Sequence, residues 1–120
     1  MQVERVDFVG IPATDMERAR AFYRDVLELP QNPSDPDEFE AGNVTLAVWD
    51  PTKFGLEFKS NGEADIALRV ADVAAARAEL EGKGVEFFGE IRDSGVCHMA
   101  FFADPDGNSL MLHHRYAPHE

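Results

Sequence analysis

The sequence repeats one pattern of secondary structure, and this repeat constrains the fold more than any other feature. A shift of 57 residues superimposes Val9 on Ile66, Ile11 on Leu68, Asp15 on Asp72 and residues 19–21 on residues 76–78. A shift of 65 residues superimposes Gly42-Asn43 on Gly107-Asn108. The two shifts differ because the loop between the helix and the later strands differs in length. Together they predict a duplicated module, with module 1 at about residues 1–60 and module 2 at about residues 61–120.

Hydrophobic periodicity predicts the order βαβββ in each module, and therefore an α+β fold. In module 1 it predicts a strand over 6–12, a helix over 15–29 that ends at Pro30, and short strands near 39–41, 44–50 and 54–59. Residues 30–38 are rich in Pro and Asp and are predicted to form an exposed loop. In module 2 it predicts strands over 65–70, 85–91, 96–103 and 109–114, with a helix over 72–84.

Charge and cysteine content restrict the partners and the compartment. The net charge of −12 disfavours nucleic acids and anionic membranes, because both require a cationic surface. Cys97 is the single cysteine, so no intrachain disulfide forms, and its apolar strand pattern predicts a buried side chain. The N-terminal residues lack a signal-peptide pattern, and no apolar run is long enough to cross a bilayer. We therefore expect a cytoplasmic protein with no nucleic-acid or membrane partner.

Three stretches carry a resemblance to a known family: ATDMERARAFYRDVLEL at 13–29, ALRVADVAAARAELEGKGVEF at 67–87 and MAFFADPDGNSLML at 99–112. With the doubled βαβββ order, they resemble the vicinal oxygen chelate superfamily, which includes glyoxalase I, bleomycin-resistance proteins and extradiol dioxygenases. The resemblance covers nearly all of residues 1–120 and implies a single domain. It implies that the two modules form a curved, incompletely closed mixed-sheet barrel with the helices outside.

The resemblance also implies a cleft in which a divalent metal binds to residues on strands of both modules. Aligned by the helix starts and by the Gly-Asn turns, the family's ligand positions are Phe8, Leu46, Asp65 and Met111. Phe8 and Leu46 have no donor atom, and a Met thioether favours soft copper over Mg, Mn, Fe or Zn. Asp65 alone cannot hold the ion, so no metal or other cofactor is expected.

Strand alternation predicts what lines the cleft instead. Val9 and Ile11 are expected to face the helix, as are Leu110 and Leu112. The predicted ligand-binding residues are Phe8, Leu46, Val48, Asp65, Arg69, His98, Met111 and His113. Arg69 either pairs with Asp65 or holds a ligand carboxylate. The face that His98 occupies depends on the register of the last hairpin.

The leading interpretation is a metal-independent protein that binds a small drug-like or aromatic molecule, with no catalytic residue assigned. The drug-sequestering branch that it resembles implies a homodimer. The alternative is an enzyme, either a lyase, isomerase or dioxygenase with one divalent metal at Asp65, His98 and His113, or one that uses His113 as a metal-free base. A third interpretation is a structural or partner-binding module whose barrel is filled by side chains.

Overall fold

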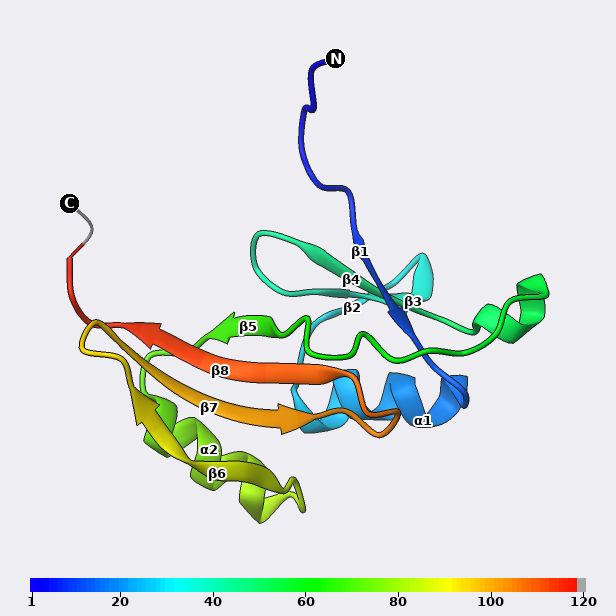
Figure 1. Ribbon diagram of the computed structural model, residues 1–120. Coiled ribbons are helices and arrows are strands. Elements are labelled where there is room, and N and C mark those ends of the chain that lie inside the picture. The colour runs from blue at the N-terminus through cyan, green and yellow to red at the C-terminus, as the bar shows by residue number, and fades with distance from the viewer. Residues whose placement is uncertain (119–120) are drawn as a thin grey trace. The chain divides into compact units, whose positions relative to one another are not determined.

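The computed structural model of the protein describes residues 1–118. The chain divides into two compact units, Met1–Asn61 and the segment from Gly62 onward. Each unit contains one α-helix and one four-stranded mixed sheet, in the order βαβββ (Figure 1). The structure confirms the predicted α+β fold and its two βαβββ modules.

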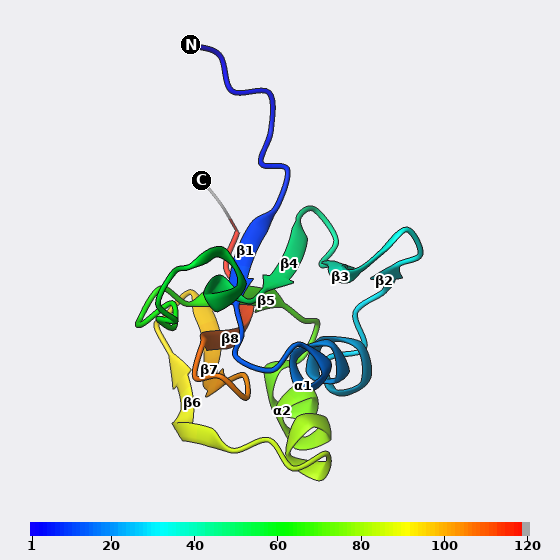
Figure 2. The ribbon, with the colours of Figure 1, turned by 90° about the vertical axis from the view of Figure 1, so that its right-hand side faces the viewer.

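The first unit begins with strand β1 (Val9–Pro12), followed by helix α1 (Met16–Ala21) and a π-helical turn (Phe22–Val26). Strands β2 (Gln31–Asn32), β3 (Asp35–Glu40) and β4 (Thr45–Trp49) follow, and a short 3-10 helix covers Pro51–Phe54. The strand order is β1-β4-β3-β2, which Figure 2 shows in sequence across the sheet. β1 pairs with β4 in parallel, and the other pairs are antiparallel.

The predicted loop at 30–38 is wrong, because this segment forms most of the β2–β3 hairpin. Within β3, Pro36 is compatible with the sheet because it has no register partner on β2 or on β4. The side-chain amide of Gln31 donates to the Pro36 carbonyl at 2.7 Å. An ion pair between Arg20 and Asp37, at 2.6 Å, links the hairpin to α1.

The predicted strand at 54–59 is also wrong. Asp50 begins the 3-10 helix by accepting a hydrogen bond from the Thr52 amide at 3.0 Å. Gly55 ends that helix in the left-handed region, with φ of 74°, and the segment that follows has no regular structure. The β2–β3 hairpin therefore provides the strands that complete the first βαβββ module.

The core of the first unit lies between α1 and one face of its sheet. Tyr23 and Phe39 are fully buried, and their ring centres lie 6.0 Å apart. On the opposite face, the indole of Trp49 lies over Gly10, where a Cβ atom would come within 3.2 Å of the indole nitrogen. A larger residue at this position would crowd the ring, whose centre lies 6.0 Å from that of Phe54.

The second unit contains β5 (Ile66–Arg69), α2 (Val73–Gly82), β6 (Phe87–Asp93), β7 (Cys97–Ala103) and β8 (Ser109–Arg115). The strand order is β5-β8-β7-β6, with β5 and β8 parallel and the other pairs antiparallel. Helix α2 packs against β6, β7 and β8 (Figure 1). Leu110 and Leu112 are buried, which confirms the prediction that they lie beneath a helix.

A buried polar turn at 104–108 joins β7 to β8. The Asp104 carboxylate accepts hydrogen bonds from the amides of Asp106 and Asn108, both at 2.9 Å. The Asn108 side chain donates to the same carboxylate at 2.8 Å, and Gly107 has a φ of 83°. These bonds satisfy two polar side chains that lie in the protein interior. Across this turn, β7 and β8 pair in antiparallel from Cys97–Arg115 to Ala103–Ser109.

Candidate functional site

The sheet registers identify which residues are equivalent in the two units. Val9 lies opposite Leu46 in the first sheet, and its counterpart Ile66 lies opposite Leu110 in the second. Leu46 is therefore equivalent to Leu110, and its predicted equivalence to Met111 is wrong by one residue. The physical reason is the length of the turn. β4 begins two residues after the first Gly-Asn pair, whereas β8 begins one residue after the second.

This difference of one residue moves two predicted ligand-binding side chains to the other face of the first sheet. Leu46 and Val48 lie opposite Val9 and Ile11, which were expected to face the helix. Leu46 is 0% exposed and Val48 is 2% exposed. Both side chains belong to the core beneath α1, and their prediction as cleft-facing residues is wrong.

The corrected register also changes the metal positions that the resemblance implies. The counterpart of Met111 is Ala47, because these residues lie opposite the equivalent positions Ala67 and Gly10. An alanine offers no donor atom. Phe8 is exposed and offers none either, so Asp65 is the only hard ligand at these positions. These side chains do not fit the family's metal site.

Within residues 1–118, no cluster of three or more His, Cys, Asp or Glu side chains is arranged to hold a metal.

The second sheet has one face that packs on α2 and one that is turned away from it, here called the distal face. Across the distal face, Arg69 of β5 lies opposite His113 of β8, and His113 lies opposite Met99 of β7. Met99 in turn lies opposite Arg92 of β6. These four residues form a line across all four strands, here called the cationic row. Opposite Cβ atoms in such pairs lie about 5 Å apart, so the row spans about 14 Å.

A second line of residues, here called the apolar row, runs beside the cationic row on the distal face. It contains Ala67, Met111, Phe101 and Phe88, each opposite the next. Met111 and Phe101 are half-buried, and Phe88 is 62% exposed. The register therefore confirms that Met111 and His113 share a face with Arg69, although their role in ligand binding stays a prediction.

His98 does not lie on the distal face. It lies opposite His114 on β8 and opposite Asp93 on β6, so its side chain points to the α2 side of the sheet. His113 points to the other side. The alternative metal site at Asp65, His98 and His113 is therefore wrong, because its two imidazoles lie on opposite faces of one sheet.

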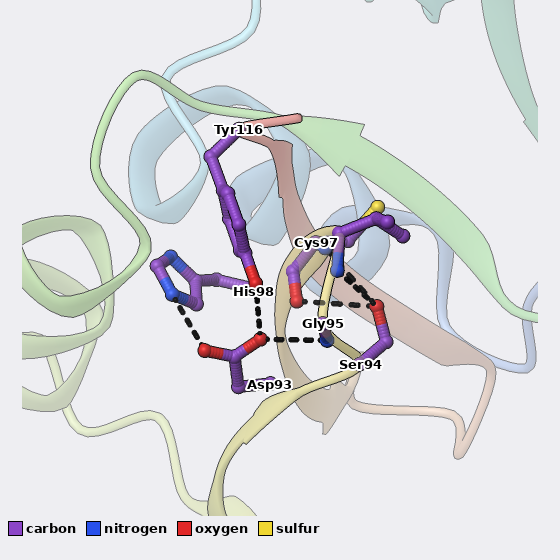
Figure 3. A network of polar contacts seen from close by, with 7 residues as sticks. Asp93, Ser94, Gly95, Cys97, His98 and Tyr116 are labelled. Atoms are coloured by element: carbon purple, nitrogen blue, oxygen red, sulfur yellow. Dashed lines mark hydrogen bonds and ion pairs between the residues drawn. The ribbon is translucent and has the colours of Figure 1, made fainter. Parts of the chain in front are cut away.

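On the α2 side, His98 belongs to a polar network that sequence reasoning missed (Figure 3). The Asp93 carboxylate accepts hydrogen bonds from the Tyr116 hydroxyl at 2.7 Å and from the Gly95 amide at 2.8 Å. Its other oxygen lies 3.4 Å from Nε2 of His98. The ring centres of His98 and Tyr116 are 4.8 Å apart. Only the hairpin register, which the sequence leaves open, brings these residues together.

These hydrogen bonds change the acidity of both partners. The Tyr116 hydroxyl, with help from the Gly95 amide, lowers the pKa of Asp93 below its ordinary value of 3.8. The same bond to Asp93 raises the pKa of Tyr116 above its ordinary value of 10.0. Both shifts favour the state in which the carboxylate is charged and the phenol is neutral.

A cavity of about 500 Å³ adjoins this network, where the first turn of α2 meets the sheet. Its walls include Val73, Ala74, Ile91, His98, His114 and Tyr116. Nδ1 of His114 is hydrogen-bonded to the Val70 carbonyl at 2.9 Å, which fixes the orientation of that ring. The cavity lies on the opposite side of the sheet from the distal face.

Among residues 1–118, no helix is both long and apolar enough to cross a membrane. The search of curated proteins finds no match for this chain.

Solved structures provide close matches in fold. The antibiotic-binding protein TnmS3 from Streptomyces sp. CB03234 is 26% identical, with a TM-score of 0.75 over 93% of this chain and 96% of that one. Lactoylglutathione lyase from Agrobacterium tumefaciens is 21% identical, with a TM-score of 0.75 over 93% and 94%. A glyoxalase/bleomycin resistance protein/dioxygenase from Nocardioides is 18% identical, with a TM-score of 0.77 over 100% and 92%. The last two matches show the fold alone.

The family comparison covers most of the sequence. Residues 5–112 match the Glyoxalase/Bleomycin resistance protein/Dioxygenase superfamily. This match extends from before β1 into β8, and it includes every predicted site residue except His113. The chain therefore belongs to the glyoxalase/bleomycin resistance protein/dioxygenase superfamily.

Proposed function

We propose that this protein binds a small organic molecule on the distal face without the help of a metal. The observation that carries the proposal is the apolar row, in which Met111, Phe101 and Phe88 lie side by side and remain partly exposed. Side chains of this size contribute about 1.5–3 kcal/mol each when they are fully buried. A ligand that covers them therefore gains affinity from surface that the fold itself leaves in contact with water.

Two further features support a binding role. Met99 and Met111 are diagonal neighbours on the distal face, and the flexible thioether side chain adapts to ligands of different shape. The similarity to an antibiotic-binding protein, at 26% identity over nearly the full length of both chains, is consistent with this role. The competing enzyme with a relocated metal site has lost its geometric basis, since His98 and His113 lie on opposite faces.

The four methionines provide a direct test. Met99 and Met111 lie on the distal face, whereas Met1 and Met16 belong to the first unit. We would label the methionine methyl groups with ¹³C and titrate the protein with phenylnaphthylamine, a neutral aromatic molecule. The proposal expects the signals of Met99 and Met111 to shift, with Met1 and Met16 as internal controls. Shifts confined to the controls, or no shift at any signal, would overturn it.

The homodimer implied by the resemblance remains part of the proposal. Light scattering would distinguish one chain of 13.3 kDa from an assembly of twice that mass. A single species at 13.3 kDa across the concentrations used for ligand titration would reject the dimer and leave the binding role unchanged.

A further inference from the structure

We propose that the ligand of the distal face is an organic anion, in which an aromatic or apolar body carries a carboxylate, sulfonate or similar group. Arg69 and His113 hold the anionic group, and the apolar row receives the body. This inference rests on the proposed binding function and adds the chemical class of the ligand. It is carried by the geometry of the cationic row and by the absence of ion-pair partners for its arginines.

The unpaired arginines are unusual in this chain, where 23 acidic residues face 11 Lys and Arg. Arg69 and Arg92 form no ion pair or side-chain hydrogen bond with any residue in the described range 1–118. In particular, Arg69 does not pair with Asp65, which was one of its two expected roles. The remaining role is recognition of a ligand, since guanidinium groups bind carboxylate-like groups through two parallel hydrogen bonds.

Arg77, on the α2 side of the same unit, differs from Arg69 and Arg92 because its guanidinium has partners within the protein. It donates to the Gly89 carbonyl at 2.9 Å and lies 3.5 Å from a carboxylate oxygen of Glu81. Its guanidinium also lies 4.9 Å from the ring centre of Phe87. Arg77 therefore supports the fold, whereas the side chains of Arg69 and Arg92 are exposed and make no contact of this kind.

The paired positions of the distal face carry no acidic side chain. The residues in register there are Ala67, Arg69, Phe88, Arg92, Cys97, Met99, Phe101, Ala103, Ser109, Met111, His113 and Arg115. Asp93 follows Arg92 in the sequence, but its carboxylate is bound by Tyr116 and Gly95 on the α2 side. Glu90 lies in the irregular segment between Phe88 and Arg92 and forms no ion pair with Arg92.

The net charge of −12 does not prevent an anion from binding here. At physiological ionic strength, charges farther away than about 8 Å are largely screened by salt. Arg69 and His113 are direct neighbours, about 5 Å apart at Cβ, so both reach one anionic group. The guanidinium of Arg69, with the imidazole of His113 beside it as a second hydrogen-bonding group, therefore determines which ligand charge is favoured.

The spacing of the two rows defines the shape of the ligand. Along β5, β7 and β8, the apolar row lies two residues from the cationic row, a distance of about 7 Å, whereas on β6 the irregular segment separates Phe88 from Arg92 by four residues. The anionic group and the centre of the apolar body must be separated by a similar distance. A fused or linked pair of aromatic rings with one acidic substituent has these dimensions.

A matched pair of probes tests the inference. Anilinonaphthalene sulfonate and phenylnaphthylamine share one aromatic skeleton, and only the former carries a negative charge. We expect wild-type protein to bind the sulfonate at least about tenfold more tightly than the neutral probe, and this preference to decrease as salt is added. Methionine methyl shifts at Met99 and Met111 would confirm that both probes occupy the distal face.

Arg69→Gln is expected to abolish most of this preference while it leaves the affinity for the neutral probe within about twofold of wild type. Lys83→Gln makes the same charge change at the end of α2 and should alter neither affinity. Thermal midpoints would verify that each variant is folded. Equal affinity of wild type for the two probes, or an equal loss of both in Arg69→Gln, would overturn the inference and leave the binding function standing. If neither probe binds, the proposed function itself fails.

Discussion

His98 lies directly opposite His114 across the β7–β8 pair, so the sequence neighbours His113 and His114 point to opposite faces of one sheet. This relationship gives the second unit two chemically different surfaces. The α2 side carries the Asp93 network and a cavity, whereas the distal face carries the cationic and apolar rows. The sequence alone does not show to which of these two surfaces a given histidine side chain points.

The role of Met111 can be tested by two substitutions. Met111→Ala should weaken the binding of a neutral aromatic probe by about 1–3 kcal/mol, because it removes apolar surface from the distal face. Met111→Glu should weaken it more, since it places a charged carboxylate among the apolar side chains, Ala67 and Phe101, that a neutral probe would cover. Calorimetric titration would measure both effects. Met16→Ala is the matched control in the first unit, and equal losses in the control and Met111→Ala would contradict the assignment.

The donor set at the family's metal positions predicts the metal content. Protein purified without a chelator should contain no stoichiometric Mn, Fe, Ni or Zn, because Phe8, Ala47 and Met111 provide no hard ligand beside Asp65. Elemental analysis of the purified protein would measure this. About one such ion per chain, released by Asp65→Ala, would show that other side chains complete a site and would restore the enzyme interpretation.

The corrected position of Leu46 leads to a prediction about stability. Leu46→Ala should lower the free energy of unfolding by about 2–5 kcal/mol, because the side chain is fully buried beneath α1. Leu56→Ala, at a leucine that is 55% exposed, is the control and should change it by less than about 0.5 kcal/mol. Urea unfolding would measure both values. A weaker affinity for the probe in folded Leu46→Ala, without a loss of stability, would return this residue to the binding site.

The Asp93–Tyr116 hydrogen bond predicts a dependence of stability on pH. Because folding lowers the pKa of Asp93, its contribution is present above pH 3.8 and is lost as the pH falls below that value. Because folding raises the pKa of Tyr116, its contribution is present below pH 10.0 and is lost as the pH rises through the raised pKa. Between these limits, wild type should be more stable than Tyr116→Phe, which keeps the aromatic ring beside His98.

Carbon NMR of the side-chain carboxyl groups would measure the acidity directly. Tyr116→Phe should raise the pKa of Asp93 toward 3.8, because the variant lacks the hydroxyl that donates to the carboxylate. The Gly95 amide then becomes its main hydrogen-bond donor. An unchanged Asp93 titration in the variant would mean that the Tyr116 bond does not persist in solution.

The sequence contained enough information to predict the repeated βαβββ order. Asp15 and Asp72, which the shift of 57 residues superimposes, both begin helices by accepting a hydrogen bond from the backbone amide three residues later. The helix starts and the apolar alternation of β8 depend on local chemistry, which a single sequence displays.

What could not be predicted depends on register. A turn longer by one residue before β4 exchanges the two faces of that strand, which moved Leu46 and Val48 into the core. The partners of His98 depend in the same way on how β6, β7 and β8 align, and β6 is irregular between Phe88 and Arg92. Side chains that come from different strands meet only after these alignments are fixed.

The Trp49 ring stacked over Gly10 has a spectroscopic consequence. Trp49 is the single tryptophan of the chain and belongs to the first unit, whereas the proposed ligand surface belongs to the second. Its fluorescence therefore reports the melting of the first sheet, and the methionine methyl signals at 99 and 111 report the second. Superimposable transitions from the two reporters would indicate that the two halves unfold as one cooperative body, and separated transitions would indicate that each half unfolds on its own.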